Sequence, residues 1–199
     1  MRLDWQARSA LLGGAVALVL LAGCGSTQPS RYYLLSGSSG AGGAGVADPG
    51  GPLIALGPFT WPEYLNRPQI ATRRSDTEIH LAEYHRWAEP LPASFLTALV
   101  EDVARRIGSE RVVAFPWNGR PEIGCRVRGE VARFDADPGG EAVLIVRWLV
   151  SRGPENPGTT RRTRYQSSAT PGDYASLVAA LSETVSLFGA DVAGACSGS

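Results

Sequence analysis

The sequence predicts an α+β fold, a two-layer domain in which two amphipathic helices pack on one face of a largely antiparallel or mixed β-sheet. Most of the chain after residue 30 consists of short runs in which apolar and polar residues alternate, as in half-buried strands. Two longer segments repeat apolar residues every three or four positions, as helices with one buried face do. Placing both helices on the same side of the sheet buries all three apolar surfaces together.

The N-terminal segment, residues 1–23, has the organisation of a lipoprotein signal peptide. Two arginines precede an apolar run that ends in Leu-Ala-Gly-Cys, and this run is shorter than the roughly 20 residues that a spanning helix needs. The ending resembles the bacterial lipobox, in which a diacylglycerol is attached to the cysteine, here Cys24. Gly25 stands where an Asp would favour the inner membrane, so the resemblance implies an outer-membrane anchor facing the periplasm. The alternative is a short buried helix that contains a cysteine.

A tether over residues 24–30 and a single domain over residues 31–190 follow the signal peptide. Residues 36–52 are rich in Gly and Ser and bury too little to order themselves, so we expect a flexible loop there. The expected strands span residues 31–35, 53–59, 77–87, 111–115, 123–137, 141–152 and 161–168. A turn with the sequence DPGG joins the fifth and sixth strands into a hairpin. The sixth strand is the most apolar, so we expect it at the centre of the sheet, with its Trp148 in the core.

The two helices are predicted from their apolar stripes and their ends. The first spans about 92–107, with a proline in its first turn and Gly108 just past its end. Its charged side chains form one solvated face (Glu101, Asp102, Arg105 and Arg106). The second helix starts with Thr170 as N-cap and runs to about Gly189. Residues 191–199 are small and polar, so we expect a disordered tail.

Two cysteines remain if Cys24 carries lipid. A disulfide between Cys125 and Cys196 suits an oxidising compartment, but Cys125 can equally be an ordinary buried thiol. The cysteine and histidine spacings predict no metal site.

The sequence holds no recognisable catalytic motif. His80 and His85 are five residues apart in a strand, which places them on opposite faces. A hydrolase would have to combine these histidines with Ser75 or Ser94, and no nucleophile elbow supports that alternative. The 19 basic and 19 acidic residues balance, which argues against a nucleic-acid partner, since such a partner demands a basic surface.

Four segments together resemble the PqiC family of auxiliary lipoproteins from ABC-type and MCE-type transport systems. They are the lipobox with the YYLL after it, LGPFTWPEYLNRPQIATR at 56–73, HRWAEPL at 85–91 and FPW at 115–117. The family pattern in the second segment is matched by Gly57, Pro58, Pro62, Tyr64, Leu65, Arg67, Gln69, Ile70 and Arg73. The Gly-rich segment at 36–52 is longer than the family pattern implies.

The resemblance implies a non-enzymatic role with no cofactor besides the lipid on Cys24. It implies a homo-oligomeric lipoprotein that works with an MCE-domain tunnel protein and inner-membrane components to move lipids or other hydrophobic molecules and support envelope integrity. An assembly lipoprotein unrelated to transport is the main alternative. We expect Leu65 and Ile70 to face the core, and Tyr64 and Arg67 to face a neighbouring subunit. The candidate partner or oligomer contacts are Trp61, Pro62, Tyr64, Arg67, Arg73, Trp87 and Trp117. The three tryptophans each end an extended run, where an aromatic side chain can close a core or anchor an interface, and core closure is the favoured interpretation.

Overall fold

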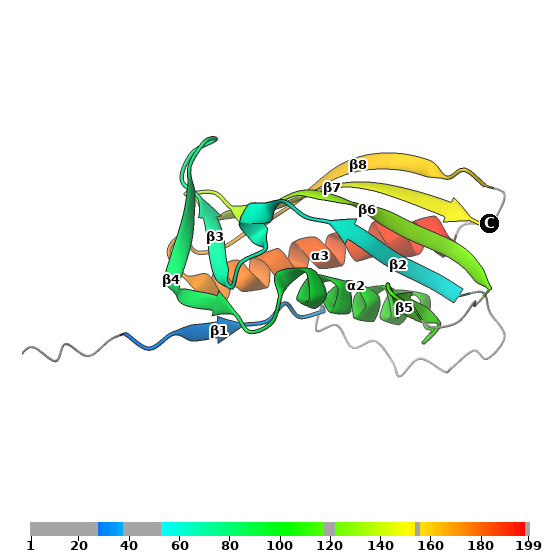
Figure 1. The fold of residues 1–199 in the computed structure, drawn as a ribbon, viewed down its shortest axis with the longest axis horizontal. Coiled ribbons are helices and arrows are strands. Elements are labelled where there is room, and N and C mark those ends of the chain that lie inside the picture. Colours follow the sequence, from blue (N-terminus) through cyan, green and yellow to red (C-terminus); the bar gives the residue numbers. More distant parts are fainter. Residues whose placement is uncertain (1–27, 38–52, 118–121, 154–155, 198–199) are drawn as a thin grey trace, which may run out of the picture.

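The computed structural model describes residues 28–37, 53–117, 122–153 and 156–197 (Figure 1). The predicted signal peptide, Cys24, Gly25 and most of the Gly-rich segment lie outside these residues. The elements are β1 (Arg31–Tyr33), β2 (Leu53–Thr60), the 3-10 helix η1 (Glu63–Leu65), β3 (Gln69–Arg73), β4 (Ile79–Trp87), α2 (Leu91–Ile107), β5 (Val112–Ala114), β6 (Ile123–Ala136), β7 (Glu141–Arg152), β8 (Thr159–Ser168) and α3 (Tyr174–Ser197).

The strands form one mixed sheet organised around β6. Strand β2 runs parallel to the first half of β6, and β3 meets the same edge further on, where Thr72 pairs with Ala136. The opposite edge of β6 pairs antiparallel with β7 in the predicted hairpin, and β8 continues the sheet beyond β7. Strand β4 joins β3, β1 joins β4, and β5 joins β2. The predicted α+β class is therefore confirmed, with β6 rather than β7 at the centre of the sheet.

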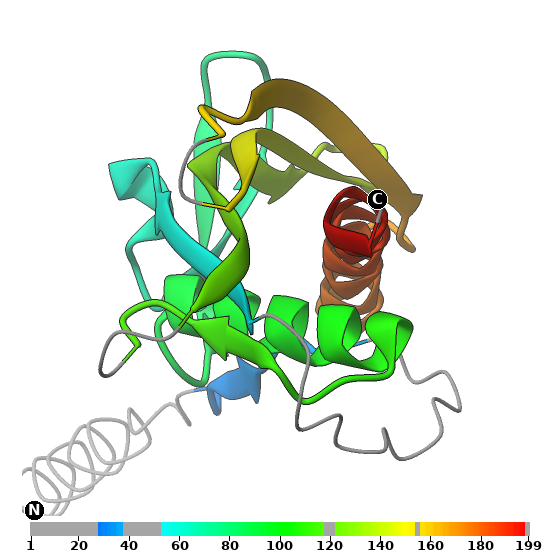
Figure 2. The same cartoon turned by 90° about the vertical axis from the view of Figure 1, so that its right-hand side faces the viewer.

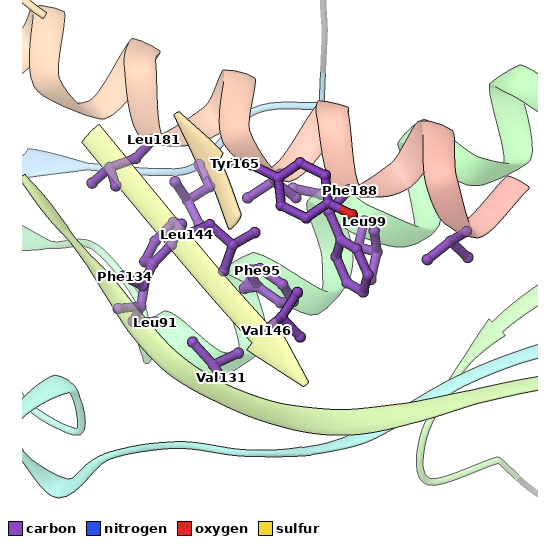
Figure 3. Close-up of a cluster of buried hydrophobic side chains, with 14 of the residues drawn as sticks. Leu91, Phe95, Leu99, Val131, Phe134, Leu144, Val146, Tyr165, Leu181 and Phe188 are labelled. Carbon is purple, nitrogen blue, oxygen red and sulfur yellow. The ribbon is translucent and has the colours of Figure 1, made fainter. Parts of the chain in front are cut away.

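The sheet curves around the two helices, which lie on the same side of it (Figures 1 and 2). The core fills the space between the layers. Side chains from α2, α3 and three strands meet there, among them Phe95, Phe134 and Phe188, all at most 1% exposed (Figure 3). Trp148 lies edge-on to Phe188 with ring centroids 5.5 Å apart, as the apolar pattern of its strand predicts.

Helix α2 has the predicted ends. Its C-cap Gly108 has φ of 64°, a left-handed conformation that glycine adopts without the steric penalty of a Cβ. The prediction of a solvated charged face was wrong for Asp102, which is fully buried, whereas Glu101 and Arg106 are exposed. The Arg106 Nε donates to Asp102 Oδ2 at 2.6 Å, and the Ser186 Oγ lies 3.2 Å from Asp102 Oδ1. This face is the polar part of the α2–α3 interface.

Helix α3 differs from the prediction at both ends. It starts at Tyr174, and Asp173 caps it by accepting the N–H of Ala175 at 2.9 Å, whereas Thr170 lies in the preceding turn. It continues to Ser197, so the predicted tail is helical over residues 191–197. The helix is long and apolar enough to cross a membrane by length and composition alone. However, 67% of its most apolar 18-residue stretch is buried in the domain, as in a core helix.

Two contacts order the end of α3. The structure contains the disulfide between Cys125 of β6 and Cys196, with a Cα–Cα distance of 5.7 Å. The Arg152 guanidinium donates to the backbone carbonyl of Ala195, with Nε at 2.9 Å. The prediction of a disordered tail rested on the small and polar residues of this segment. Small residues also allow a helix to pack closely on a sheet, as the end of α3 does.

Candidate functional site: the connector and its groove

The segment 61–73, which we call the connector, leads from the end of β2 through η1 into β3 and includes β3 itself. Strands β2 and β3 meet the same edge of β6. Pro62 is the N-cap of η1, with φ of −62°, and its carbonyl accepts the N–H of Leu65 at 3.0 Å. Leu65 and Ile70 are buried, as predicted. Proline restricts φ, and the short 3-10 turn restricts the residues between the strands. The connector is therefore fixed at both ends and through its middle.

A buried carboxylate, Asp135 of β6, gathers the polar side chains of the connector. The Tyr64 hydroxyl donates to Asp135 Oδ2 at 3.0 Å, and the Arg73 Nη2 donates to the same oxygen at 3.1 Å. Arg133 Nε donates to Asp135 Oδ1 at 2.6 Å. We call these four residues the Asp135 cluster. It fastens the connector to the outer face of β6, the face opposite the helices.

The electrostatics of the Asp135 cluster favour a structural role. Burial, followed by the nearby Asp135 charge, raises the pKa of Tyr64 to about 12. The hydrogen bond to Asp135 also raises the pKa of Arg73 above its ordinary value. Tyr64 is thus a neutral donor and Arg73 a permanent cation at neutral pH. The Tyr64 hydroxyl is used within the domain, on Asp135, and a contact of its half-buried ring with a neighbouring subunit stays a prediction.

Two of the candidate tryptophans close the core. Trp61 is half-buried and lies edge-on to Phe95 and Phe134, with ring centroids 5.0 and 6.0 Å away. Trp87 is only 5% exposed, as the favoured core-closing role requires, and a partner contact at this position stays a prediction. An indole at the end of a strand has enough apolar area to seal the margin of a core.

The two longest family-like segments meet at the surface. The N–H of Trp87 donates to the carbonyl of Pro68 at 2.7 Å, and Gln69 pairs with Arg86. A groove of about 300 Å³ lies between them, lined by Asn66, Arg67, Pro68, Trp87, Ala88, Glu89, Pro90 and Leu91. We call it the signature groove. Its floor includes the buried Trp87 and Leu91, and Arg67 and Glu89 are exposed on its rim. Arg67 therefore remains a candidate contact.

Trp117 lies in a separate region, after β5. Its ring is edge-on to Phe115 at 5.5 Å, and the Arg126 guanidinium sits 5.4 Å from the ring centroid. Phe115 is 44% exposed. Trp117 is half-buried, so a partner contact there stays a prediction.

The serines and histidines do not form a catalytic pair. Ser94 is buried in α2, and its Oγ accepts the N–H of Leu35 at 3.2 Å. Ser75 lies in the turn between β3 and β4, where its Oγ is 3.4 Å from the Thr77 hydroxyl. His80 contacts Arg74, and His85 stacks on Tyr174 with ring centroids 3.9 Å apart. Among the described residues, no three metal-ligating side chains gather into one group.

The sequence analysis did not identify Asp135 or Arg133 as part of the site. The only signal was their spacing of two residues, which puts both on one face of a strand. That face is otherwise expected to be solvated, so the spacing alone does not indicate a buried carboxylate.

Comparisons with known proteins agree with this fold. The chain is 23% identical to the intermembrane transport lipoproteins PqiC of Escherichia coli and Shigella flexneri, over 68% of this chain and 71% of each relative. A crystal structure of an uncharacterized protein matches 83% of this chain and 97% of its own, with a TM-score of 0.68 and 18% identity. A Xanthomonas campestris protein matches with a TM-score of 0.60 and 15% identity over 82% of this chain and 93% of its own.

The sequence model of one family matches residues 33–193, which include strands β2 to β8, helix α2 and most of α3. Together with the PqiC relatives, this match confirms the resemblance carried by the connector and by the HRWAEPL segment. The chain belongs to the family of ABC-type transport auxiliary lipoprotein components.

Proposed function

We propose that this protein is a lipid-anchored docking subunit of an intermembrane transport system. In this proposal, Cys24 carries the lipid, Gly25 directs the protein to the outer membrane, and the domain faces the periplasm. The domain docks, as a homo-oligomer, with an MCE-domain tunnel protein whose inner-membrane partners supply lipids or other hydrophobic molecules. The protein itself performs no catalytic step and holds no cofactor besides its lipid.

The rigid connector is the observation that best supports a docking role. Family-like residues of segments 61–73 and 85–91 fix the conformation of this surface, through the Asp135 cluster and the Trp87–Pro68 hydrogen bond. They leave a preformed groove with an apolar floor and a charged rim. A preformed surface binds a partner without first paying the entropy of ordering loops.

The anchor is tested directly by mass spectrometry of the mature N-terminus. The expected N-terminal peptide begins at Cys24 and carries the added mass of a diacylglycerol. A peptide that begins upstream of Cys24, or an unmodified Cys24, would contradict the anchor.

Fractionation tests the membrane assignment. With residues 1–23 replaced by an ordinary secretory signal and Cys24→Ser, we expect the protein in the soluble periplasmic fraction. The matched variant Gly25→Asp keeps the lipid but should move from the outer-membrane to the inner-membrane fraction. If the Cys24→Ser protein stayed with the membranes, the lipid would not be its anchor.

A further inference from the structure

The outer face of β6, β7 and β8, opposite the two helices, carries an excess of positive charge. Side chains alternate between the faces of a strand, and the buried Val146, Trp148 and Val150 point to the core. The residues that alternate with them along β7 therefore point to the outer face. The residues of β6 and β8 that pair with those residues share this face. Its exposed arginines, which we call the arginine face, are Arg126, Arg128, Arg147, Arg162 and Arg164.

The pairing of these strands places like charges against each other. Arg147 of β7 is directly opposite Arg162 of β8, an arrangement that destabilises a sheet unless other charges compensate. Glu130 lies 3.9 Å from Arg147, and Glu141 lies 2.9 Å from Arg164. Within the described part of the chain, no carboxylate comes within ion-pair distance of Arg128 or Arg162.

The excess of charge is local. Five exposed arginines and the part-buried Arg133 share this face with Glu130, Glu141 and the buried Asp135, while the whole chain has a formal net charge of zero. A concentration of one sign on one face steers a partner of the opposite sign toward it and suppresses partners of the same sign.

A hollow of about 350 Å³ lies within the arginine face. Its lining residues are Pro58, Thr60, Arg128, Gly129, Glu130, Arg147, Trp148, Leu149 and Thr160. Pro58 and Leu149 supply apolar side chains, whereas the Trp148 ring is buried in the core. Gly129 lets the strands approach, since a Cβ there would lie 2.4 Å from the Arg147 carbonyl oxygen. The hollow can receive one apolar side chain of a partner, while the arginines around it contact acidic residues next to that side chain in the partner.

The position of this face favours a protein partner over the anchoring membrane. Strand β1, to which the predicted tether leads, lies at the bottom of the molecule in both views, and β8 lies at the top (Figures 1 and 2). Six residues lie between Cys24 and Arg31, so this segment reaches at most about 25 Å when fully extended. A domain held through β1 turns its β8 side away from the lipid surface.

We propose that the arginine face docks an acidic protein segment of the transport assembly, whose apolar side chain enters the hollow beside Gly129. The proposal rests on the proposed function only in assigning the partner to that assembly. Charged edge strands also protect a sheet from aggregation, but Arg126, Arg128 and Arg147 lie on strands that are paired on both sides, where edge protection is not needed.

A peptide-binding measurement tests this docking. The probe is a fluorescent acidic peptide with one central Phe, and its counterpart has Gln and Asn in place of the acids. With the full lipidated chain in non-ionic detergent, we expect binding of the acidic peptide, about tenfold weaker binding of the counterpart, and weakening by salt. The double variant Arg128→Glu/Arg162→Glu should lose about tenfold or more in affinity.

The control variant is Arg31→Glu/Arg74→Glu, which changes the net charge equally but away from the arginine face. It should bind like the unmodified chain, and thermal unfolding verifies that both double variants are folded. An equal loss of peptide affinity in the two double variants would overturn the proposal, as would a failure of the unmodified chain to bind the acidic peptide.

Peptide binding measured on lipid vesicles distinguishes a protein partner of the arginine face from a membrane partner. The lipidated chain on neutral vesicles and on vesicles containing phosphatidylglycerol should bind the acidic peptide equally well. Loss of peptide binding only on the anionic vesicles would make the face a lipid contact and overturn the proposal. Failure of the chain to attach to any vesicle would instead contradict the anchor of the proposed function, and the detergent measurement would still decide the docking.

Discussion

Two fully buried aspartates organise the polar interior of this domain. Asp102 joins α2 to α3 through Arg106 and Ser186, and Asp135 joins the connector to β6 through Tyr64 and Arg73. A buried carboxylate is tolerated only when charges and donors compensate its loss of water. Each aspartate therefore fixes the relative position of segments that are far apart in the sequence.

Removing the charge of Asp135 tests the role of its cluster. In Asp135→Asn, Arg73 and Arg133 keep their charges while their side chains are only 19% and 18% exposed. An uncompensated, largely buried cation is costly, so we expect a loss of about 3 kcal/mol in the free energy of unfolding. Urea denaturation measures it.

Asp76→Asn is the control, since Asp76 is exposed in the turn between β3 and β4. It should change the free energy of unfolding by less than about 0.5 kcal/mol. Similar small losses in both variants would show that the Asp135 cluster does not hold the connector.

At the scale of secondary-structure elements, the α2–α3 contact depends on a glycine. A Cβ on Gly189 would lie 2.3 Å from Asp102 Oδ2, whereas a Cβ on Gly194, one and a half turns further along α3, would meet no atom within 4 Å. The helices can approach at the buried aspartate only because Gly189 has no side chain.

Alanine at these two positions should act in opposite directions. Gly189→Ala forces the helices apart and should destabilise the protein by about 2 kcal/mol. Gly194→Ala should stabilise it by up to about 1 kcal/mol, because alanine has the higher helix propensity. Thermal unfolding monitored by circular dichroism compares them. A stabilising Gly189→Ala would mean that α2 and α3 do not pack as described.

The elements themselves could be predicted because their signals are local. Extended and alternating patterns located every strand except β3, which lies within the segment interpreted as a connector. Apolar stripes located both helices, and Gly108 marked the end of α2. The extension of α3 through residues 191–197 could not be predicted, since it depends on Cys125 and Arg152, which are distant in sequence. The buried state of Asp102 was missed for the same reason: its partner Ser186 belongs to another helix.

The same limit applied to the candidate site. The family-like segments were recognised from sequence, and Leu65 and Ile70 were correctly placed in the core. The contacts that Tyr64 and Trp87 make within the domain could not be predicted, because a tyrosine or tryptophan suits a core margin and an interface equally well. Only the meeting of β3, β4 and β6 in space decides between them.

At the scale of the whole molecule, the domain has distinct sides. The tether is predicted to leave near β1, the signature groove lies between the connector and the start of α2, and the arginine face lies on the outer side of β6–β8. A protein that links a membrane to a periplasmic partner needs such separate surfaces for its anchor and its partner.

Crosslinking in the native cell tests the docking function most directly. A photo-reactive residue is placed in the full lipidated chain at the exposed Arg67 or Arg162, and at Arg74 as a control. Mass spectrometry then identifies the products from the membrane fraction. We predict a product with an MCE-domain transport protein from position 67 or 162, with or without a second copy of this chain, and none from position 74. Recovery of another envelope assembly from positions 67 and 162, with no MCE-domain protein, would contradict the account.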